Sequence, residues 1–378
     1  MPATYLSENG RWRVTARDDH FIDVYDLTVS SQTPRQTVDS VMADQSAVTR
    51  PEFVPVQEFD QFSPVAARAA YNLRARLLQP RRWHRGVSLG LPANGWELDA
   101  SVVGLAGVGV DPRSLPAYTG SYTLNNGALI EGVKLTQPLI LNVPNGRTVT
   151  LRKCWLTEQV KGDWSTTFAG SLVIEDCLFD TGARGADEGS AYYDAITLAS
   201  NGSPTAFLTM RRSVIRGWGR GWWVDVDALI EHCVYEMGTW FGNPATTGSH
   251  NEAVTHRDTS HPVFRACRLD CGPYVGADRG QQNLSAVVQC QGNGSSAGNL
   301  TLDSCLLALP SNLLGQPHVV ADFHVPGSIV DGTINVVGCR FSPASSAYNV
   351  SSFDKGDWRG NFRYDPRNPP SYQGEAVV

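Results

Sequence analysis

The 378-residue chain lacks the features that mark several common classes of protein. Lysine occurs only at positions 134, 153, 161 and 355 and the formal net charge is −6, so we expect no nucleic-acid partner. No apolar run approaches the length of a membrane span, so we expect no spanning segment. Residues 1–5 lack the basic and apolar regions of a secretory leader, which argues against an exported enzyme.

Helix signals are also scarce, with one exception. Ser63 is a candidate N-cap, and Pro64 suits the first helical position. Apolar residues then recur at positions 65, 69, 73 and 77, and Gln79-Pro80 would end the helix. We therefore expect a short helix over residues 64–78. Ahead of it, residues 11–15 and 21–29 alternate like strands.

One short motif, in contrast, recurs eight times between Ala128 and Phe341 and stops there. The copy Leu172-Val173-Ile174-Glu175-Asp176-Cys177-Leu178-Phe179 has an apolar pair at i and i+2, two polar residues, a small residue and a later apolar residue. Because strand side chains alternate faces, each apolar pair predicts a strand and each polar pair a corner. The small residues form a column comprising Val133, Cys154, Cys177, Ser213, Cys233, Cys267, Cys305 and Cys339.

The spacing of this column indicates a solenoid. Consecutive members lie between 20 residues (Ser213 to Cys233) and 38 residues (Cys267 to Cys305) apart. A fixed motif with a variable spacer is typical of stacked coils from which extra residues leave as loops. The shortest spacing has room for about three short strands and no helix.

Six of the eight cysteines belong to the column, where we expect buried, reduced thiols. Side chains stacked on neighbouring coils have parallel Cβ vectors, which suit a disulfide poorly. Cys271 and Cys290 lie off the column, and their pairing stays open.

The repeat resembles that of the pectate-lyase-like right-handed parallel β-helix family, over roughly residues 85–345. That family includes polysaccharide lyases and hydrolases and many phage tail proteins. The expected fold is all-β, a right-handed parallel β-helix with an N-terminal extended arm and a short capping helix. The expected regions are an attachment arm over 1–62, the helix and a linker over 63–85, the solenoid over 86–345, with its first coils in 86–127, and a C-terminal cap over 346–378.

A candidate site lies where one coil is shorter than its neighbours. The lines that begin at Asp194, Glu252 and Ser285 follow long insertions, whereas the coil at Ser213 has none and its equivalent position falls near Val224. We expect this coil to form the floor of a notch, with the insertions as walls. The expected glycan contacts are Arg216, Trp218, Arg220, Trp222 and Trp223 on the floor, and Asp187, Glu188, Tyr193, Trp240 and His250 on the walls. The alternative is that these aromatic residues pack against the body or against another subunit.

Asp194 and Glu252 are candidate catalytic residues, because they should lie two coils apart, or about 9.6 Å. That separation is near the upper limit for an inverting carboxylate pair. The segment Gly248-Ser249-His250-Asn251-Glu252 resembles a coil of the family in which Asp is usual at the last position, and there the acid often has a structural role. We expect no cofactor and no metal, since His250, His256 and His261 lack a metal-binding spacing.

The resemblance favours a bacteriophage virion protein, a minor tail or tail-tip component that contacts host surface polysaccharide. It would assemble in the host cytoplasm and act outside the cell. Residues 1–60 would bind other tail or capsid proteins, and the resemblance implies a homo-oligomer, with a trimer as its usual form. The alternatives are a polysaccharide lyase or glycoside hydrolase and a head-decorating capsid protein.

Overall fold

The computed structural model divides the chain into two compact units, Met1–Gly90 and Leu91–Val378. The described residues are 4–7, 12–16, 22–26, 53–55, 91–181, 194–199, 205–236, 238, 252–257, 260–272, 286–290, 299–308, 319–323, 333–342, 348–350 and 354–377. The helix expected over 64–78 lies outside these residues. So do Asp187, Glu188, Tyr193, Trp240 and His250, the residues predicted to form the walls of the notch.

The N-terminal unit contains an antiparallel sheet in the order β3-β2-β1-β4. Its strands are β1 (Thr4–Ser7), β2 (Trp12–Ala16), β3 (Ile22–Asp26) and β4 (Phe53–Pro55). The strands expected near residues 11–15 and 21–29 are therefore confirmed. The region expected to be an extended arm includes this small sheet.

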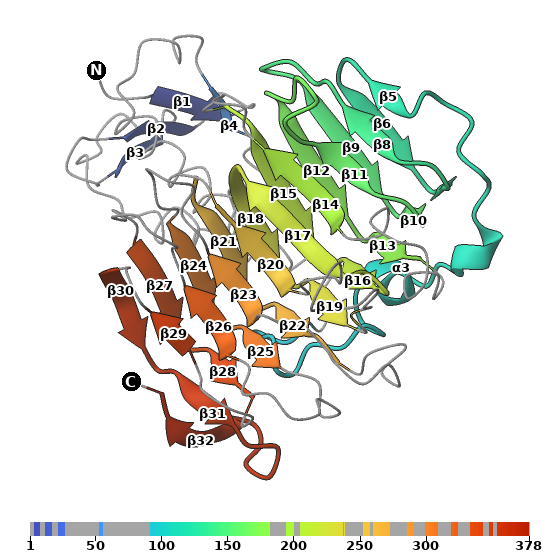
Figure 1. Ribbon diagram of the computed structural model, residues 1–378. Coiled ribbons are helices and arrows are strands. Elements are labelled where there is room, and N and C mark those ends of the chain that lie inside the picture. The colour runs from blue at the N-terminus through green and yellow to red at the C-terminus, as the bar shows by residue number, and fades with distance from the viewer. Residues whose placement is uncertain are drawn as a thin grey trace. The chain divides into compact units, whose positions relative to one another are not determined.

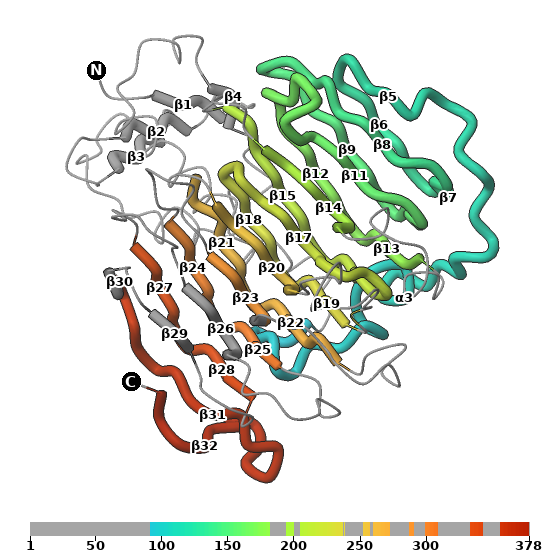
Figure 2. The backbone as a smooth tube through the Cα atoms, in the orientation of Figure 1, coloured from blue at the N-terminus to red at the C-terminus, as the bar shows by residue number. Residues whose placement is uncertain are grey.

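In its described residues, the second unit is built from three sheets of parallel strands (Figures 1 and 2). Sheet 1 contains β6 (Ala128–Glu131), β9 (Thr148–Arg152), β12 (Ser171–Glu175), β15 (Phe207–Arg211), β18 (Asp227–Glu231), β21 (Pro262–Arg265), β24 (Leu300–Asp303), β27 (Thr333–Val337) and β30 (Asp354–Arg359). Sheet 2 contains β7 (Lys134–Leu135), β10 (Trp155–Leu156), β13 (Leu178–Asp180), β16 (Val214–Arg216), β19 (Val234–Glu236), β22 (Arg268–Asp270), β25 (Leu306–Ala308), β28 (Arg340–Phe341) and β31 (Phe362–Tyr364). Sheet 3 contains β5 (Thr123–Leu124), β8 (Leu139–Leu141), β11 (Val160–Gly162), β14 (Asp194–Ala199), β17 (Arg220–Asp225), β20 (Glu252–His256), β23 (Ala286–Cys290), β26 (Val319–Phe323) and β29 (Tyr348–Val350).

The chain visits sheets 1, 2 and 3 in turn, so three successive strands make one coil and each strand pairs with the equivalent strand of the next coil. The strand β32 (Gln373–Ala376) ends the series by pairing antiparallel with β31. Helix is almost absent from the described residues, which contain only α3 (Gly104–Gly107) and a 3-10 turn at Pro112–Ser114. The expected all-β class, with parallel sheets, is confirmed.

The corner between sheets 1 and 2 has the same backbone conformation in every coil. The residue before each column position has a positive φ, for example 51° at Lys153, 55° at Asp176 and 65° at Gly338. Six of the eight repeats use a residue other than glycine there, although L-residues rarely adopt this conformation. The amide of the corner residue donates to the next coil, as from Lys153 to the Glu175 carbonyl at 3.0 Å. These bonds offset the strain, and the predicted corner is confirmed.

The expected column of buried cysteines is also confirmed. All eight cysteines are buried and free. Cys177 and Ser213 of the column each accept a hydrogen bond from the backbone amide of the column residue in the preceding coil. The Cys154 amide donates to Cys177 Sγ at 3.5 Å, and the Cys177 amide donates to Ser213 Oγ at 3.1 Å. The Cys339 amide likewise donates to Asn361 Oδ1 at 2.9 Å. The expectation that the repeat stops at Phe341 is therefore wrong, because Asn361 takes the column position of a further coil.

The first coils were expected to begin within residues 86–127, but residues 91–110 form no coil. They lie instead as a strap across sheet 2. The Gly95 amide donates to the Ser304 carbonyl at 2.8 Å, and the Gly104 amide to the Arg212 carbonyl at 2.7 Å, so the strap crosses several coils. Its side chains Leu98 and Val103 are buried against apolar residues on the outer face of sheet 2, Val214 and Val234. At Gly95 a Cβ atom would lie 1.9 Å from the Cys267 carbonyl oxygen, so only glycine fits. The strap thus covers an apolar face that the solenoid would otherwise expose.

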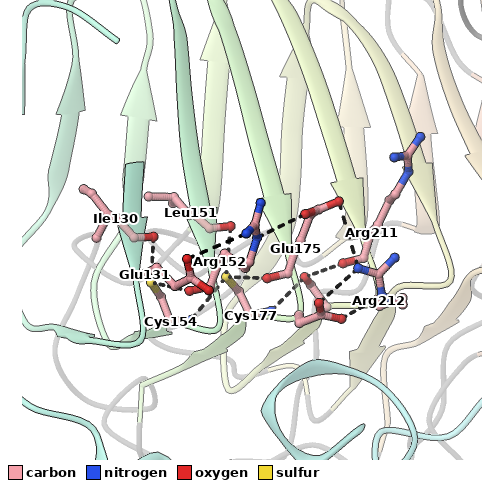
Figure 3. A network of polar contacts seen from close by, with 11 residues as sticks. Ile130, Glu131, Leu151, Arg152, Cys154, Glu175, Cys177, Arg211 and Arg212 are labelled. Carbon is pink, nitrogen blue, oxygen red and sulfur yellow. Dashed lines mark hydrogen bonds and ion pairs between the residues drawn. The ribbon is translucent and has the colours of Figure 1, made fainter. Parts of the chain in front are cut away.

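The last residues of the sheet 1 strands form a ladder of alternating charge, of which Figure 3 shows the part from Glu131 to Arg211. Its members, in coil order, are Glu131, Arg152, Glu175, Arg211, Glu231, Arg265 and Asp303. Ion pairs join Arg152 to Glu131 and Glu175, and Arg265 to Glu231 and Asp303, at 3.1 to 3.7 Å. Pairing a coil with its second neighbour would oppose like charges, so the ladder favours the correct coil order.

Candidate functional site

The candidate site lies in the middle of sheet 3, where the predicted difference in coil length is confirmed. Residues 217–219 alone join β16 to β17. In the neighbouring coils, residues 181–193 join β13 to β14 and residues 237–251 join β19 to β20. The first residues of β14, β17 and β20 are adjacent in the sheet.

The structure brings the two predicted carboxylates onto strands two coils apart, with Arg220 between them. The register pairs Asp194 with Arg220 and Arg220 with Glu252. Arg220 Nη1 donates to Asp194 Oδ1 at 2.9 Å, and Arg220 Nε donates to Glu252 Oε2 at 3.0 Å. All three residues are buried. A guanidinium with a carboxylate on each side forms a charge-assisted network that holds three coils together.

Hydroxyl groups extend this network along the sheet. Thr197 Oγ1 donates to Asp194 Oδ2 at 3.2 Å and accepts a bond from Gln159 Nε2 at 2.9 Å. Thr255 Oγ1 donates to Glu252 Oε2 at 3.4 Å. Burial raises the pKa of Asp194, and the charge of Arg220 and the bond from Thr197 oppose that change without cancelling it. A raised pKa suits a general acid, but burial keeps this carboxyl from a polymeric substrate in the structure. The catalytic role of Asp194 and Glu252 stays a prediction.

Arg220 was not singled out as the residue between the two carboxylates, because the position equivalent to the start of β14 was expected near Val224, four residues after Arg220. The register pairs Val224 with Leu198 and not with the start of β14. The residue after Arg220 is Gly221, and a Cβ there would lie 2.7 Å from the Ala253 carbonyl oxygen and 2.8 Å from Tyr235 Cδ2. The short coil therefore has glycine where its neighbours have alanine, which hides the alignment.

Two of the tryptophans expected on the floor of the notch are core residues and not glycan contacts. Trp218 and Trp222 have no exposed surface and belong to the interior cluster. The Trp222 ring packs edge-on against Phe264 with 5.6 Å between centroids. Arg216 lies on sheet 2, where it pairs with Glu236 at 2.6 Å. These three residues do not join Arg220 and Trp223 at one surface.

Trp223 does reach the outer face of sheet 3. Its neighbours Trp222 and Val224 belong to the interior cluster, so the alternation of the strand directs Trp223 outward. Trp223 Nε1 donates to Asp225 Oδ2 at 2.7 Å. The guanidinium of Arg220 lies over the Trp223 ring, with its carbon 4.9 Å from the ring centroid.

Trp164 completes an aromatic pair that the sequence analysis did not single out. It is 58% exposed, and its ring meets Trp223 edge-on with 5.1 Å between centroids. It sits in a tight turn in which the Ser165 amide and hydroxyl donate to Asp163 Oδ1 at 2.9 and 2.6 Å. Burial raises the pKa of Asp163, but bonds from Ser165 and Lys161 outweigh that effect and leave it lowered. The Asp-Trp-Ser turn after β11 was the available sequence signal.

The described residues contain no group of three or more His, Cys, Asp or Glu side chains arranged to hold a metal ion. Among the same residues, no helix has the length and apolar character needed to cross a membrane. Comparison of the chain with family models, curated proteins and solved structures gives no match.

Proposed function

We propose that this protein binds glycans without cleaving them, through the outer face of sheet 3 at Trp164 and Trp223. The observation that carries the proposal is the exposed Trp164 ring, held on a hydrogen-bonded turn against a second tryptophan. Flat aromatic faces beside polar groups are suited to the apolar faces of sugar rings.

The energetics of Trp164 support a ligand. A tryptophan side chain can bury about 200–250 Å². With 58% of the residue exposed, about 100–150 Å² remains in water, which corresponds to about 3 kcal/mol of burial free energy. The turn fixes the backbone at Trp164, and Trp223 packs against the ring, so less conformational entropy is lost on binding.

The carboxylates support binding over cleavage. A glycosidase of the inverting type needs one free acid and one free base on opposite sides of the substrate. Asp194 and Glu252 instead bind the same guanidinium from the two sides and are buried with it. Their strongest interactions stabilise the sheet beneath the aromatic pair.

We further propose that the second unit is a right-handed parallel β-helix, since crossover connections between parallel strands are almost always right-handed. The setting that fits an adhesive solenoid is a phage virion, as a minor tail or tail-tip protein whose residues 1–60 bind its neighbours and which forms a homo-oligomer. Locating the protein on assembled particles by labelled antibody tests this setting, and a head location would favour a decorating protein.

The binding proposal is tested with Trp164→Ala and a matched control, Leu129→Ala. Leu129 is 62% exposed on sheet 1, so both variants remove a large exposed side chain. We expect calorimetry with polysaccharide purified from a host envelope to show at least tenfold weaker binding for Trp164→Ala and no change for Leu129→Ala. Equal binding by both variants would refute the proposal. If wild type shortened the polysaccharide and Asp194→Asn did not, the result would favour the enzyme.

A further inference from the structure

Arg257 stands directly after β20 and next to the aromatic pair. Its guanidinium carbon lies 4.4 Å from the Trp223 ring centroid, over the ring. Its backbone amide donates to Asp225 Oδ1 at 2.7 Å, which fixes the start of the side chain. The residue is partly exposed.

The guanidinium of Arg257 makes no hydrogen bond or ion pair within the described part of the chain, and its Nε is buried without a partner. The other arginine over the Trp223 ring differs in this respect, because the Arg220 guanidinium binds two carboxylates. An arginine held in place by its backbone and by ring stacking, whose fork of donors has no partner among the described residues, is suited to a planar anion.

The carboxylates near Arg257 already have other partners. Asp194 and Glu252 accept from Arg220. Asp225 accepts from Trp223 Nε1 through one oxygen and from the Arg257 amide through the other. No carboxylate of the described residues lies within ion-pair distance of the Arg257 guanidinium.

We propose that Arg257 is an anion subsite, which binds a carboxylate or phosphate substituent of an acidic sugar whose ring stacks on Trp164. This inference rests on the proposed glycan-binding function and names its substrate class. The two side chains reach the same Trp223 ring, one over it and one at its edge, so a sugar on Trp164 would place a ring substituent within reach of Arg257.

The local charge decides how such a subsite would select its ligand. Three cations, Arg220, Arg257 and Lys161, lie among four described carboxylates, Asp163, Asp194, Asp225 and Glu252, so the described surroundings have no excess of positive charge. Selection therefore depends on directed, bidentate hydrogen bonds and not on a long-range field, and we expect only modest weakening of binding by salt.

The test uses a panel of defined oligosaccharides that carry a carboxylate or a phosphate, each with a neutral counterpart of the same ring structure. The full-length protein is compared with Arg257→Gln, Arg257→Lys and Trp164→Ala. Arg152→Gln is the control, because Arg152 is a partly exposed arginine of the sheet 1 ladder. Circular dichroism and thermal midpoints establish that each variant is folded.

We expect wild type to prefer the charged member of a pair, and Arg257→Gln to lose about 10- to 100-fold in affinity for it, as removal of a charge-assisted bond predicts. Arg257→Gln should leave the neutral member unchanged, and Trp164→Ala should weaken both. Arg257→Lys should lose most of the preference because it lacks the fork. Comparing the carboxylate and phosphate members of the panel shows which of the two anionic groups the subsite binds.

The two proposals fail in different ways. If Trp164→Ala weakens binding but wild type does not distinguish charged from neutral members, the anion subsite is refuted and the glycan surface stands. If Arg257→Gln behaves like Arg152→Gln, or Arg257→Lys binds as wild type does, the subsite is refuted as well. If no panel member binds, or Trp164→Ala has no effect, the proposed function itself fails.

Discussion

Replacing Arg220 by methionine removes a buried guanidinium from between two carboxylates. The Arg220 side chain is 3% exposed, and those of Asp194 and Glu252 are 12% and 0% exposed. Methionine fills a similar volume but leaves both acids without a counter-charge. Breaking a buried ion pair in this way destabilises a protein by about 3–5 kcal/mol, because a buried charge remains unpaired.

The triple variant Arg220→Met, Asp194→Asn, Glu252→Gln separates this effect from lost packing. It removes all three charges together, so no buried charge is left unpaired. We therefore expect its free energy of unfolding to lie within about 2 kcal/mol of the wild-type value. Urea unfolding at pH 7, followed by far-UV circular dichroism, gives each free energy of unfolding from its midpoint and slope. A loss below about 1 kcal/mol for Arg220→Met, or an equal loss for the triple variant, would contradict the buried network.

Three further predictions concern pH, the charge ladder and the strap. Burial raises the pKa of Asp194 in the folded state. The contribution of this carboxyl to the free energy of unfolding is therefore fully present below about pH 3.9 and is lost as pH rises through the raised pKa. In urea titrations, the stability of wild type relative to Asp194→Asn should fall over that pH window, and a rising difference would refute the assignment. Glu231→Gln, at a side chain with no exposure that binds two arginines, should cost about 3 kcal/mol, whereas Glu131→Gln, 39% exposed, should cost under about 1 kcal/mol in the same assay. Gly95→Ala should cost about 1–3 kcal/mol and speed proteolysis of the strap, since its Cβ would meet a carbonyl oxygen at 1.9 Å, and unchanged digestion would argue against that contact.

The repeat was predictable because burial leaves a periodic trace in the sequence. The interior column must be small in every coil, and cysteine at six of its positions makes it visible. Asn361 escaped the search because it is polar, yet it is buried and donates through Nδ2 to the Val336 carbonyl at 2.8 Å, so hydrogen bonding replaces apolar packing there. The strap had no periodic trace at all, since it buries only a few side chains against the outside of a sheet.

The candidate site was only partly predictable, for a different reason. Composition placed Arg220, Trp222 and Trp223 in one short coil, but the faces they occupy depend on strand register, and a shift of one residue moves a side chain to the opposite face. Trp222 is therefore interior and Trp223 exterior. Trp164 and Arg257 come from other coils, and their approach to Trp223 depends on three-dimensional stacking that no local pattern contains.

A crystal structure of the protein soaked with an oligosaccharide from the host envelope tests the central claim most directly. The account predicts a sugar ring on Trp164 at the outer face of sheet 3, with an acidic substituent at Arg257. Sugar bound only elsewhere on the molecule, with the Trp164 ring still in solvent, would contradict it.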